Sequence, residues 1–314
     1  MVTGYMDERE GIMITETTEN RYANDWNAYS ATWDAQYGER YRHLGDEWCD
    51  DGTAERTHER RVLGLVEPWV KPGTRALEIG PGGGKWTVQL APKVSSLVVF
   101  DVAQAMLERT ERRCQDAGVE NASFVLGDGN GLTGVPDASL HIIFSYDVFV
   151  HIALEDTIAY IDDFARTLVP GGIAIVHHAV AETASASDRI ESHNDWYRDR
   201  SHTLGQYYYQ SREGLRRAYE RAGFEIIETW DFYCTSVFTV RKQAESLVPR
   251  MERALRLAAT ATTPEALKAA TDAFEQAVDE ARERLTPLVA SLEGSTPGLK
   301  RYAVLQKMRR LFRG

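Results

Sequence analysis

The feature that most constrains the fold of this chain is an apolar segment that runs directly into a run of glycines. Residues 76–79 (Ala-Leu-Glu-Ile) have the length and composition of a buried strand, and residues 80–84 (Gly-Pro-Gly-Gly-Gly) follow at once. Glycine tolerates backbone angles that other residues avoid, and its missing side chain lets a ligand approach the main chain. The segment therefore predicts a strand-to-helix turn at which a ligand binds.

The sequence around this turn predicts an α/β domain over residues 55–242. Apolar segments of strand length alternate with segments of helical period, the pattern of a parallel sheet with crossover helices. The expected fold is a seven-stranded, mostly parallel sheet. We expect strands at 74–79, 96–101, 122–126, 140–145, 172–178, 224–230 and 233–240, and helices at 55–70, 85–90, 103–117, 156–168 and 212–222.

Four other segments flank or interrupt this domain. Residues 1–20 are acidic and polar, and we expect a disordered tail. Residues 21–54 begin with aromatic side chains spaced mostly three or four apart, which predicts an N-terminal helical cap. Residues 179–211 form an insertion long enough to be a lid or binding element. Residues 243–314 predict a helical extension with long helices at 243–258 and 263–290, whose apolar stripe is buried in a homodimer or against its own chain.

The charge and cysteine content narrow the class of protein. The net charge is −11, from 36 basic and 47 acidic residues, so a nucleic acid is an unfavourable partner and a cationic small molecule a suitable one. The basic segment 300–313 is interpreted as a solvated helix face. There is no apolar run of about 18 residues and no signal-like start, so we expect no membrane partner. Three scattered cysteines fit a cytoplasmic location, and no compact carboxylate cluster suggests a metal.

The glycine spacing separates two cofactor classes. Residues 78–84 read Glu-x-Gly-x-Gly-x-Gly, whereas a dinucleotide fingerprint starting at Gly80 and Gly82 would place its last glycine at position 85. Lys85 stands there instead, which counts against NAD. An NAD-type oxidoreductase remains an alternative.

Further landmarks follow the glycine turn in a recognisable order. Asp101 closes the second expected strand, Asp128-Gly129 follows the third, Phe144-Ser145-Tyr146-Asp147 ends the fourth, and Leu168-Val169-Pro170-Gly171-Gly172 leads into the fifth. Together with residues 78–84, this order resembles the class I S-adenosylmethionine (SAM)-dependent methyltransferases over roughly residues 55–240. The resemblance implies a Rossmann-like methyltransferase domain, SAM as cofactor and S-adenosylhomocysteine (SAH) as product.

The resemblance also implies roles for individual residues in holding the cofactor. Asp101 would bind both ribose hydroxyls, Asp128 would lie near the adenine amino group, and the Ser145 carbonyl would bind the methionine amine. Each has a plainer interpretation: Asp101 as a helix N-cap, Asp128 as part of a turn, and Met106 as ordinary helix packing instead of an adenine floor. The expected cofactor-binding set is Glu78, Gly80, Gly82, Gly84, Asp101, Val102, Met106, Asp128, Gly129 and Ser145.

The acceptor side is predicted from the strand ends, where open α/β sheets bind their ligands. Asp147 and His151 follow the fourth strand, and His177 and His178 lie at the end of the fifth. Strand alternation lets only one of these two histidines face the cleft, and we expect His178. The expected catalytic residues are thus His178, Asp147 and His151, and the expected substrate-binding residues are Tyr146, Asp195, Trp196, Tyr207 and Tyr208.

The predicted function is methyl transfer to a small polar metabolite. Acidity together with aromatic side chains favours the amino group of an amino sugar, such as an aminoglycoside antibiotic intermediate in natural-product metabolism. The fourth-strand exit Ser-Tyr-Asp differs from the Asn/Asp-Pro-Pro-Tyr type, which disfavours a nucleic-acid or glutamine substrate. O-methylation of a sugar or polyketide hydroxyl is the alternative, and a non-catalytic SAM-binding protein is a third reading.

Overall fold

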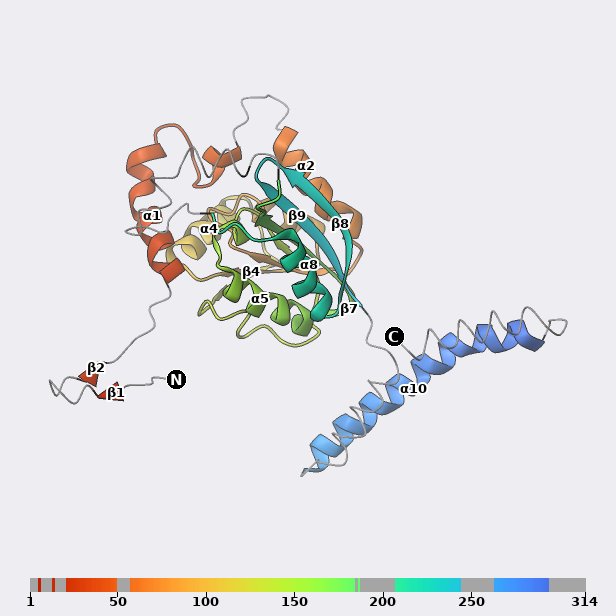
Figure 1. Cartoon of the computed structure of the whole chain (residues 1–314). Coiled ribbons are helices and arrows are strands. Elements are labelled where there is room, and N and C mark those ends of the chain that lie inside the picture. Colours follow the sequence, from red (N-terminus) through yellow and green to blue (C-terminus); the bar gives the residue numbers. More distant parts are fainter. Residues whose placement is uncertain are drawn as a thin grey trace. The chain divides into compact units, whose positions relative to one another are not determined.

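A computed structural model describes residues 5–6, 13–14, 21–49, 57–183, 186, 207–243 and 263–293. The chain divides into two compact units, Met1–Gln243 and Ala244–Gly314. The first unit contains the seven-stranded sheet, and the second contains one long described helix (Figure 1). Each unit is considered by itself.

The sheet of the first unit has the strand order β5-β4-β3-β6-β7-β9-β8, and the strand with the glycine turn, β3, lies near its middle. The pairs from β5 to β7 are parallel, whereas β9 runs antiparallel to both β7 and β8. This confirms the predicted seven-stranded, mostly parallel α/β fold. The strands span Arg75–Ile79 (β3), Ser96–Asp101 (β4), Ala122–Leu126 (β5), Leu140–Ser145 (β6), Leu168–Ala179 (β7), Phe224–Phe232 (β8) and Thr235–Lys242 (β9).

Four of the seven strands, β3, β7, β8 and β9, have bounds that differ from the expected ones, and the starts of β7 and β9 have a clear structural reason. The strand β7 begins at Leu168, four residues earlier than its glycine pair suggested, because Leu140 pairs with Leu168 before a bulge shifts the register to Ile142 and Ile173. The last strand starts at Thr235 and not at Tyr233, whose φ of 51° belongs to the tight turn between β8 and β9.

Helices cover both faces of the sheet, so the unit has three layers (Figure 1). The helices α5 and α8 bury Phe164 and Tyr219 in one core, and α2, α3 and α4 contribute Val62, Leu90 and Leu107 to the other. The helices span Arg21–Tyr37 (α1), Thr57–Val66 (α2), Thr87–Leu90 (α3), Gln104–Asp116 (α4), Leu154–Thr167 (α5) and Arg212–Arg221 (α8), with short 3-10 turns at Asp46–Cys49, Glu67–Trp69, Ala91–Lys93 and Phe149–His151.

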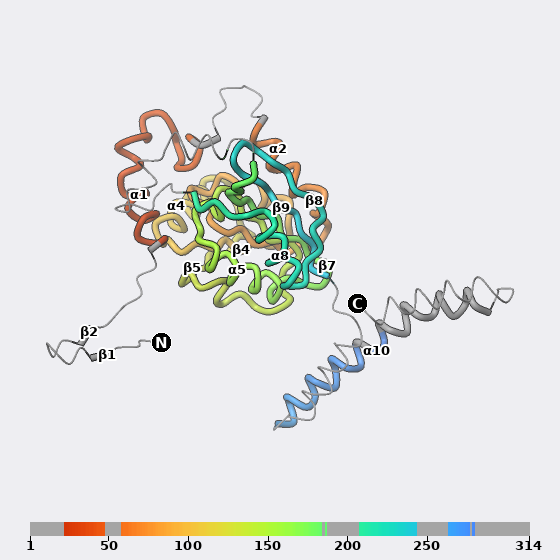
Figure 2. The backbone as a smooth tube through the Cα atoms, viewed as in Figure 1, coloured from red at the N-terminus to blue at the C-terminus, as the bar shows by residue number. Residues whose placement is uncertain are grey.

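The aromatic N-terminal segment forms a helix, α1, that lies beside α4 (Figure 2). Trp33 is buried, and its indole Nε1 donates a hydrogen bond to Glu47 Oε1 at 2.7 Å. The guanidinium of Arg109 on α4 donates to Ser30 Oγ at 2.7 Å and to Asp34 Oδ2 at 2.8 Å. These contacts fix the N-terminal segment against the first turns of α4, at the end of the sheet where the glycine turn lies.

The remaining predicted segments are only partly described. In residues 1–20, expected to be a disordered tail, Tyr5–Met6 (β1) and Met13–Ile14 (β2) pair as two-residue antiparallel strands. In the second unit, α10 spans Pro264–Glu293 and begins where Thr263 Oγ1 accepts the Ala266 N–H at 3.2 Å. The expected helix at 243–258 and the basic segment 300–313 lie outside the described residues, except Gln243, which is not helical. No helix in the described ranges has the length and apolar character needed to cross a membrane.

Candidate active site

A pocket lies at the carboxyl ends of the central strands β3, β4 and β6, the edge at which parallel sheets bind ligands. The space in this pocket and at its mouth, including the part that is open to solvent, is about 940 Å³. Its walls come from the glycine turn, the ends of β4 and β6, the start of α4 and the N-terminal segment. The lining residues are Tyr22, Trp26, Gly45, Ile79, Gly80, Pro81, Gly82, Gly83, Lys85, Trp86, Phe100, Asp101, Val102, Met106, Tyr146, Asp147, Val148, His151, Ile152 and Tyr160.

The glycine turn is packed so closely at Gly80 and Gly83 that an added side chain has no room there. Gly80 has φ 68°, and a Cβ there would lie 2.3 Å from Val148 Cγ2. A Cβ on Gly83 would lie 2.0 Å from the carbonyl oxygen of Leu44, so the N-terminal segment rests directly on the turn. The Gly80 N–H donates to the Phe100 carbonyl at 2.8 Å, which holds the turn against β4. The turn thus presents bare backbone to the pocket, as a nucleoside-binding loop requires.

Asp101 stands opposite this turn, at the end of β4. Its side chain lines the pocket although the residue is only 7% exposed, and Oδ1 accepts the Ala103 N–H at 2.8 Å. Asp101 is not the helix N-cap of the plainer reading, because α4 has Ala103 as its N-cap and no side chain caps it. Burial raises the pKa of Asp101 to about 7, so the group is poised between its two protonation states near neutral pH.

Glu78 lies beneath the turn and does not line the pocket. Its Oε2 accepts a hydrogen bond from Thr87 Oγ1 at 2.6 Å, which ties β3 to the helix after the turn. Burial raises the pKa of Glu78 to about 7. Gly84 is also outside the lining, because its Cβ position faces Thr110 on α4 at 2.9 Å. Both residues shape the turn from behind.

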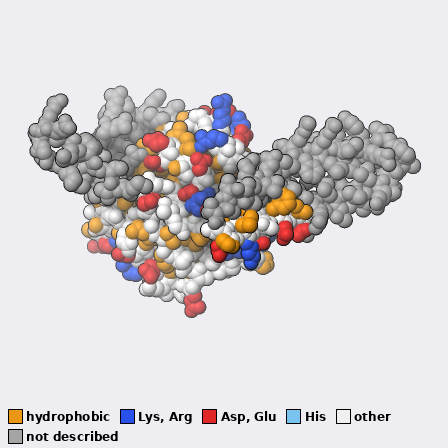
Figure 3. Space-filling view, turned by 90° about the horizontal axis from the view of Figure 1, so that it is seen from below, with side chains coloured by type: hydrophobic (Ala, Val, Ile, Leu, Met, Phe, Trp, Pro, Cys, Tyr) orange, Lys and Arg blue, Asp and Glu red, His pale blue; other side chains and the backbone are white. Residues whose placement is uncertain are grey.

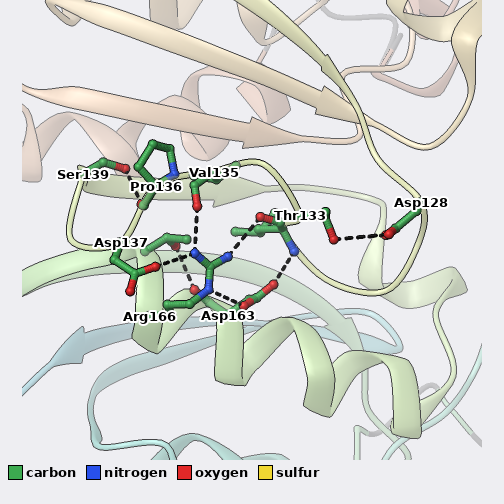
Figure 4. Close-up of polar contacts among 10 residues, drawn as sticks. Asp128, Thr133, Val135, Pro136, Asp137, Ser139, Asp163 and Arg166 are labelled. Atoms are coloured by element: carbon green, nitrogen blue, oxygen red, sulfur yellow. Dashed lines mark hydrogen bonds and ion pairs between the residues drawn. The ribbon is translucent and has the colours of Figure 1, made fainter. Parts of the chain in front are cut away.

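Three further predicted cofactor residues, Asp128, Gly129 and Ser145, are not among the residues that line the pocket. Asp128 is exposed, and its Oδ1 accepts the Asn130 N–H at 2.9 Å while Thr133 Oγ1 donates to Oδ2 at 3.2 Å (Figure 4). Asp128-Gly129 thus matches the plainer reading of a turn, with the carboxylate engaged locally. Ser145 is buried, and its hydroxyl donates to the Ile79 carbonyl at 3.0 Å, linking β6 to β3.

The prediction that His178 faces the cleft is wrong. Along β7, Ala174 and Val176 belong to the core under α5 and α8, and His178 continues that face. Its ring is fully buried beside Phe149 and Phe238, and Nε2 shares a hydrogen bond with the Tyr219 hydroxyl at 2.9 Å. Burial lowers the pKa of His178 to about 3, so it stays neutral. Apolar residues surround both histidines in sequence, and the pattern therefore did not reveal which face carries the ligand.

The neighbouring His177 points to the other face of β7 and contacts Asp147, although it is not itself among the residues that line the pocket. Its Nδ1 lies 3.0 Å from Asp147 Oδ1 and 3.2 Å from the Asp147 backbone N. The ring stacks on Tyr146, with centroids 4.3 Å apart and planes 12° from parallel. Asp147 adopts φ 60°, a conformation that costs most residues but that Asp tolerates. Burial tends to raise the pKa of Asp147, but its hydrogen bond with His177 outweighs this and holds the pKa below its usual value.

An aromatic group borders the pocket next to His151. The His151 ring meets Trp26 of α1 edge-on at 5.4 Å and Tyr207 at 5.3 Å. Tyr207 and Tyr208 are not among the lining residues; the Tyr208 N–H donates to the Val150 carbonyl at 2.8 Å and anchors the end of the insertion. Asp195 and Trp196 lie outside the described residues.

Several lining residues were missed by the sequence analysis: Tyr22, Trp26, Gly45, Lys85, Trp86 and Tyr160. The helical spacing of aromatics predicted that α1 exists but not which rings point into the pocket. Lys85 was noted only because it breaks the dinucleotide fingerprint. Within the described ranges, no three His, Cys, Asp or Glu side chains gather in a way that could hold a metal ion.

Comparisons with known proteins fit this geometry. Residues 76–172 match the family model described as "Methyltransferase domain". The chain is 29% identical over 154 residues to the biotin biosynthesis bifunctional protein BioHC of Cellvibrio japonicus, covering 49% of this chain and 28% of that protein. It is 29% identical over 138 residues to nodulation protein S of Rhizobium tropici, covering 40% of this chain and 52% of that protein. The chain thus spans at most about half the length of these relatives.

Solved structures agree at the level of the fold. The cyclase SpnF superimposes with a TM-score of 0.55 at 16% identity, covering 71% of this chain and 96% of that one. A methyltransferase candidate from Bacillus halodurans reaches a TM-score of 0.50 at 17% identity, covering 59% and 98%. Residues 76–172 thus resemble a methyltransferase domain, and they lie within the domain of the seven-stranded sheet. The cofactor of the SAM-dependent methyltransferases that this domain resembles is SAM.

Proposed function

We propose that the whole protein transfers the methyl group of SAM to a small polar acceptor, and that the acceptor atom is the amino nitrogen of an amino sugar. The observation that best supports methyl transfer is that the glycine turn and Asp101 line the same pocket. The bare backbone of the glycine turn faces Asp101, a buried carboxylate suited to accept hydrogen bonds from a vicinal diol. When bound, SAM supplies an electrophilic methyl group on a sulfonium centre.

The acceptor side of the pocket favours a cationic or polar ring. Asp147 presents a carboxylate that is 35% exposed, and Trp26, Trp86 and Tyr146 supply aromatic faces to the same space. Aromatic faces and a carboxylate together attract an ammonium group through cation–π and ionic contacts. The net charge of −11 adds a weak long-range attraction. On the face drawn in Figure 3, acidic and basic side chains are interspersed, so the local pocket charge is the stronger argument.

We infer that Asp147 and His177 together accept the proton that the nucleophile must lose. Asp147 lines the pocket, and His177 Nδ1 lies 3.0 Å from its Oδ1. A proton given up to this pair is held between Oδ1 and Nδ1 in a charge-assisted hydrogen bond. The acceptor nitrogen gains a methyl group and gives up one proton to this pair, while the sulfonium becomes a thioether.

O-methylation is the second candidate, and the same pair of residues favours it. An alcohol needs a base to ionise it, and Asp147 with His177 could serve. Fold alone does not select methyl transfer at all, because a cyclase shares this fold.

The test is an acceptor panel. The full chain is incubated with methyl-labelled SAM and sets of amino sugars, neutral sugars and polyketide alcohols, and the products are read by mass spectrometry. Label on the amino sugars supports the proposal, and label on hydroxyl compounds alone supports the alternative. No label on any compound, with SAH binding intact, would indicate a non-catalytic SAM-binding protein.

A further inference from the structure

The pair formed by Asp147 and His177 is in contact with a further aromatic side chain, that of Tyr146. Tyr146 lines the pocket, and its ring stacks on the His177 ring with the centroids 4.3 Å apart and the planes 12° from parallel. His177 itself is 2% exposed and is not among the lining residues. The position of the His177 ring therefore depends on the aromatic ring that covers it.

The His177 ring is anchored at one of its two nitrogens. Nδ1 lies 3.0 Å from Asp147 Oδ1, whereas Nε2 is buried and has no hydrogen-bond partner among the residues that the structure describes. A polar atom without a partner gives the ring no anchor at that end. Stacking on Tyr146 fixes the plane of the ring, and with it the direction in which Nδ1 points.

Tyr146 is in turn held from a different part of the chain. Its hydroxyl lies 3.3 Å from Nε2 of His58, and His58 belongs to the first turn of α2, 88 residues earlier. The His58 ring packs on Phe232 of β8, with centroids 5.2 Å apart, and the Trp86 ring meets Tyr146 edge-on at 5.8 Å. His58 does not line the pocket, so it connects Tyr146 to an element outside the pocket wall.

We propose that His58 is a positioning residue for Asp147 and His177. Its hydrogen bond fixes the Tyr146 ring, and that ring fixes the His177 ring. Nδ1 of His177 is thereby kept at Asp147. This inference rests on the proposed function and deepens it, because it assigns a further residue to the step in which the acceptor loses its proton. In this role His58 does not touch the acceptor or the cofactor.

The experiment breaks the hydrogen bond from either end. His58→Phe keeps a ring against Phe232 but loses Nε2, and Tyr146→Phe keeps the stacked ring but loses the hydroxyl. Turnover is measured on the full chain with labelled SAM and the acceptor identified in the panel, and SAH affinity is measured by calorimetry. His141→Phe is the matched control, because His141 Nδ1 accepts the Arg75 N–H at 3.0 Å near the other end of β6.

His58→Phe should lower kcat by about 5- to 10-fold, the effect of one hydrogen bond, while the acceptor KM and the SAH affinity stay within about twofold. Tyr146→Phe should lower kcat by a similar factor. The double variant should lose no more than either single variant, because both substitutions break the same bond. His58→Gln offers a new partner to the hydroxyl and should recover turnover to within about threefold of the unchanged protein. The control should change turnover by less than about twofold.

Three results would overturn the proposal. They are an unchanged kcat in His58→Phe, losses that multiply in the double variant, and a fall in SAH affinity and melting temperature that parallels the fall in kcat. The last result would assign His58 a structural role only. If His58→Phe fails to fold, Tyr146→Phe and His58→Gln carry the test, and the same losses and recovery are expected.

A second readout needs no acceptor. NMR spectra of the protein with nitrogen-labelled histidine give two imidazole nitrogen resonances for His177, which are assigned by their absence in His177→Gln. The two should be well separated in the unchanged protein and should move toward each other in His58→Phe and Tyr146→Phe, because Nδ1 is no longer held at Asp147. Unshifted resonances would overturn the proposal even if turnover falls. If the unchanged protein methylates no compound, the proposed function fails, whereas the resonances still decide whether His58 positions His177.

Discussion

The two sides of the pocket are built in different ways. The cofactor side comes from short stretches of sequence at the ends of two adjacent strands: the glycine turn after β3 and Asp101 after β4. The acceptor side combines α1, the residues after β6 and the end of β7, which lie far apart in the chain. Residues that bind a common cofactor lie close together in the sequence and form a recognisable motif. Residues that recognise a particular acceptor lie far apart in the sequence, and only the tertiary fold brings them together. Substitutions on the cofactor side should therefore lower the affinity for SAH, and substitutions on the acceptor side should lower the rate of methyl transfer.

The largest expected effect falls on the acceptor side. Asp147→Asn and His177→Gln should each reduce methyl transfer by about 100- to 1,000-fold, because each removes one member of the proton-accepting pair. SAH affinity should change by less than about twofold. Asn tolerates the φ of 60° at position 147, so the backbone should be retained. Rates are measured with the acceptor identified from the panel, and affinities by calorimetry.

A loss of SAH affinity as large as the loss of rate would show that the two sides are not separable. If Asp147→Asn lowers turnover and His177→Gln does not, His177 takes no part in proton transfer.

A smaller effect is expected where the N-terminal segment rests on the glycine turn. Gly83→Ala would place a Cβ 2.0 Å from the Leu44 carbonyl, so the segment must shift. We expect destabilisation by about 2–3 kcal/mol and weaker SAH binding. Gly64→Ala is the control, because it lies in α2 with nothing within 4 Å of its Cβ position and should stabilise by about 0.5–1 kcal/mol. Chemical denaturation measures both, and a neutral Gly83→Ala would contradict the close packing.

The next largest expected effect is the pH dependence of SAH affinity. Burial raises the pKa of Asp101 to about 7, and a diol donates hydrogen bonds to the carboxylate form, so SAH binding should strengthen as pH rises. At pH 6 about one tenth of the free protein has Asp101 ionised, and affinity should be about tenfold weaker than at pH 8. Calorimetry at both values measures this, and Asp101→Asn should remove the dependence.

Stability of the free protein should follow the opposite trend. Asp101 and Glu78 both have folded pKa values raised to about 7, above their unfolded values. Their stabilising effect is complete below the unfolded pKa and is lost as pH rises through about 7. Melting temperatures without ligand should thus fall between pH 5 and 8 by more in the unchanged protein than in Asp101→Asn.

The smallest effect is expected at His178. Replacing both partners of its hydrogen bond, as in His178→Phe with Tyr219→Phe, leaves no buried polar group unpaired and should change turnover by less than about twofold. A loss comparable to that of His177→Gln would restore His178 to the site. Kinetics with the same acceptor decide between the two histidines.

Much of the framework could be predicted from the sequence. Strands at 96–101, 122–126 and 140–145 were expected with the bounds that the structure shows, because their apolar residues are bounded by turns. The positions of Gly80, Gly82 and Asp101 followed from the strand-to-turn pattern, and all three line the pocket. The sequence pattern around a strand is sufficient to predict a site residue when the position of that residue depends on the end of that strand alone.

The remaining positions depended on information that the sequence does not contain. The choice between His177 and His178 depends on which face of β7 meets the ligand, and apolar side chains occupy both faces. The role predicted for Asp128 stays a prediction, and in the structure its carboxylate accepts a hydrogen bond from Thr133, five residues away in the same loop. Tyr22 and Trp26 reach the pocket only because α1 packs on α4, a tertiary contact without a pattern of its own.

Calorimetric titration of SAH into the unchanged protein and into Asp101→Ala tests the central claim most directly. A glycine turn facing a diol-binding carboxylate predicts saturable binding to the unchanged protein and a loss of at least about 30-fold on substitution, because charge-assisted hydrogen bonds to the ribose disappear. Equal affinity for the two proteins would contradict the account, because the pocket would then hold its nucleoside without Asp101.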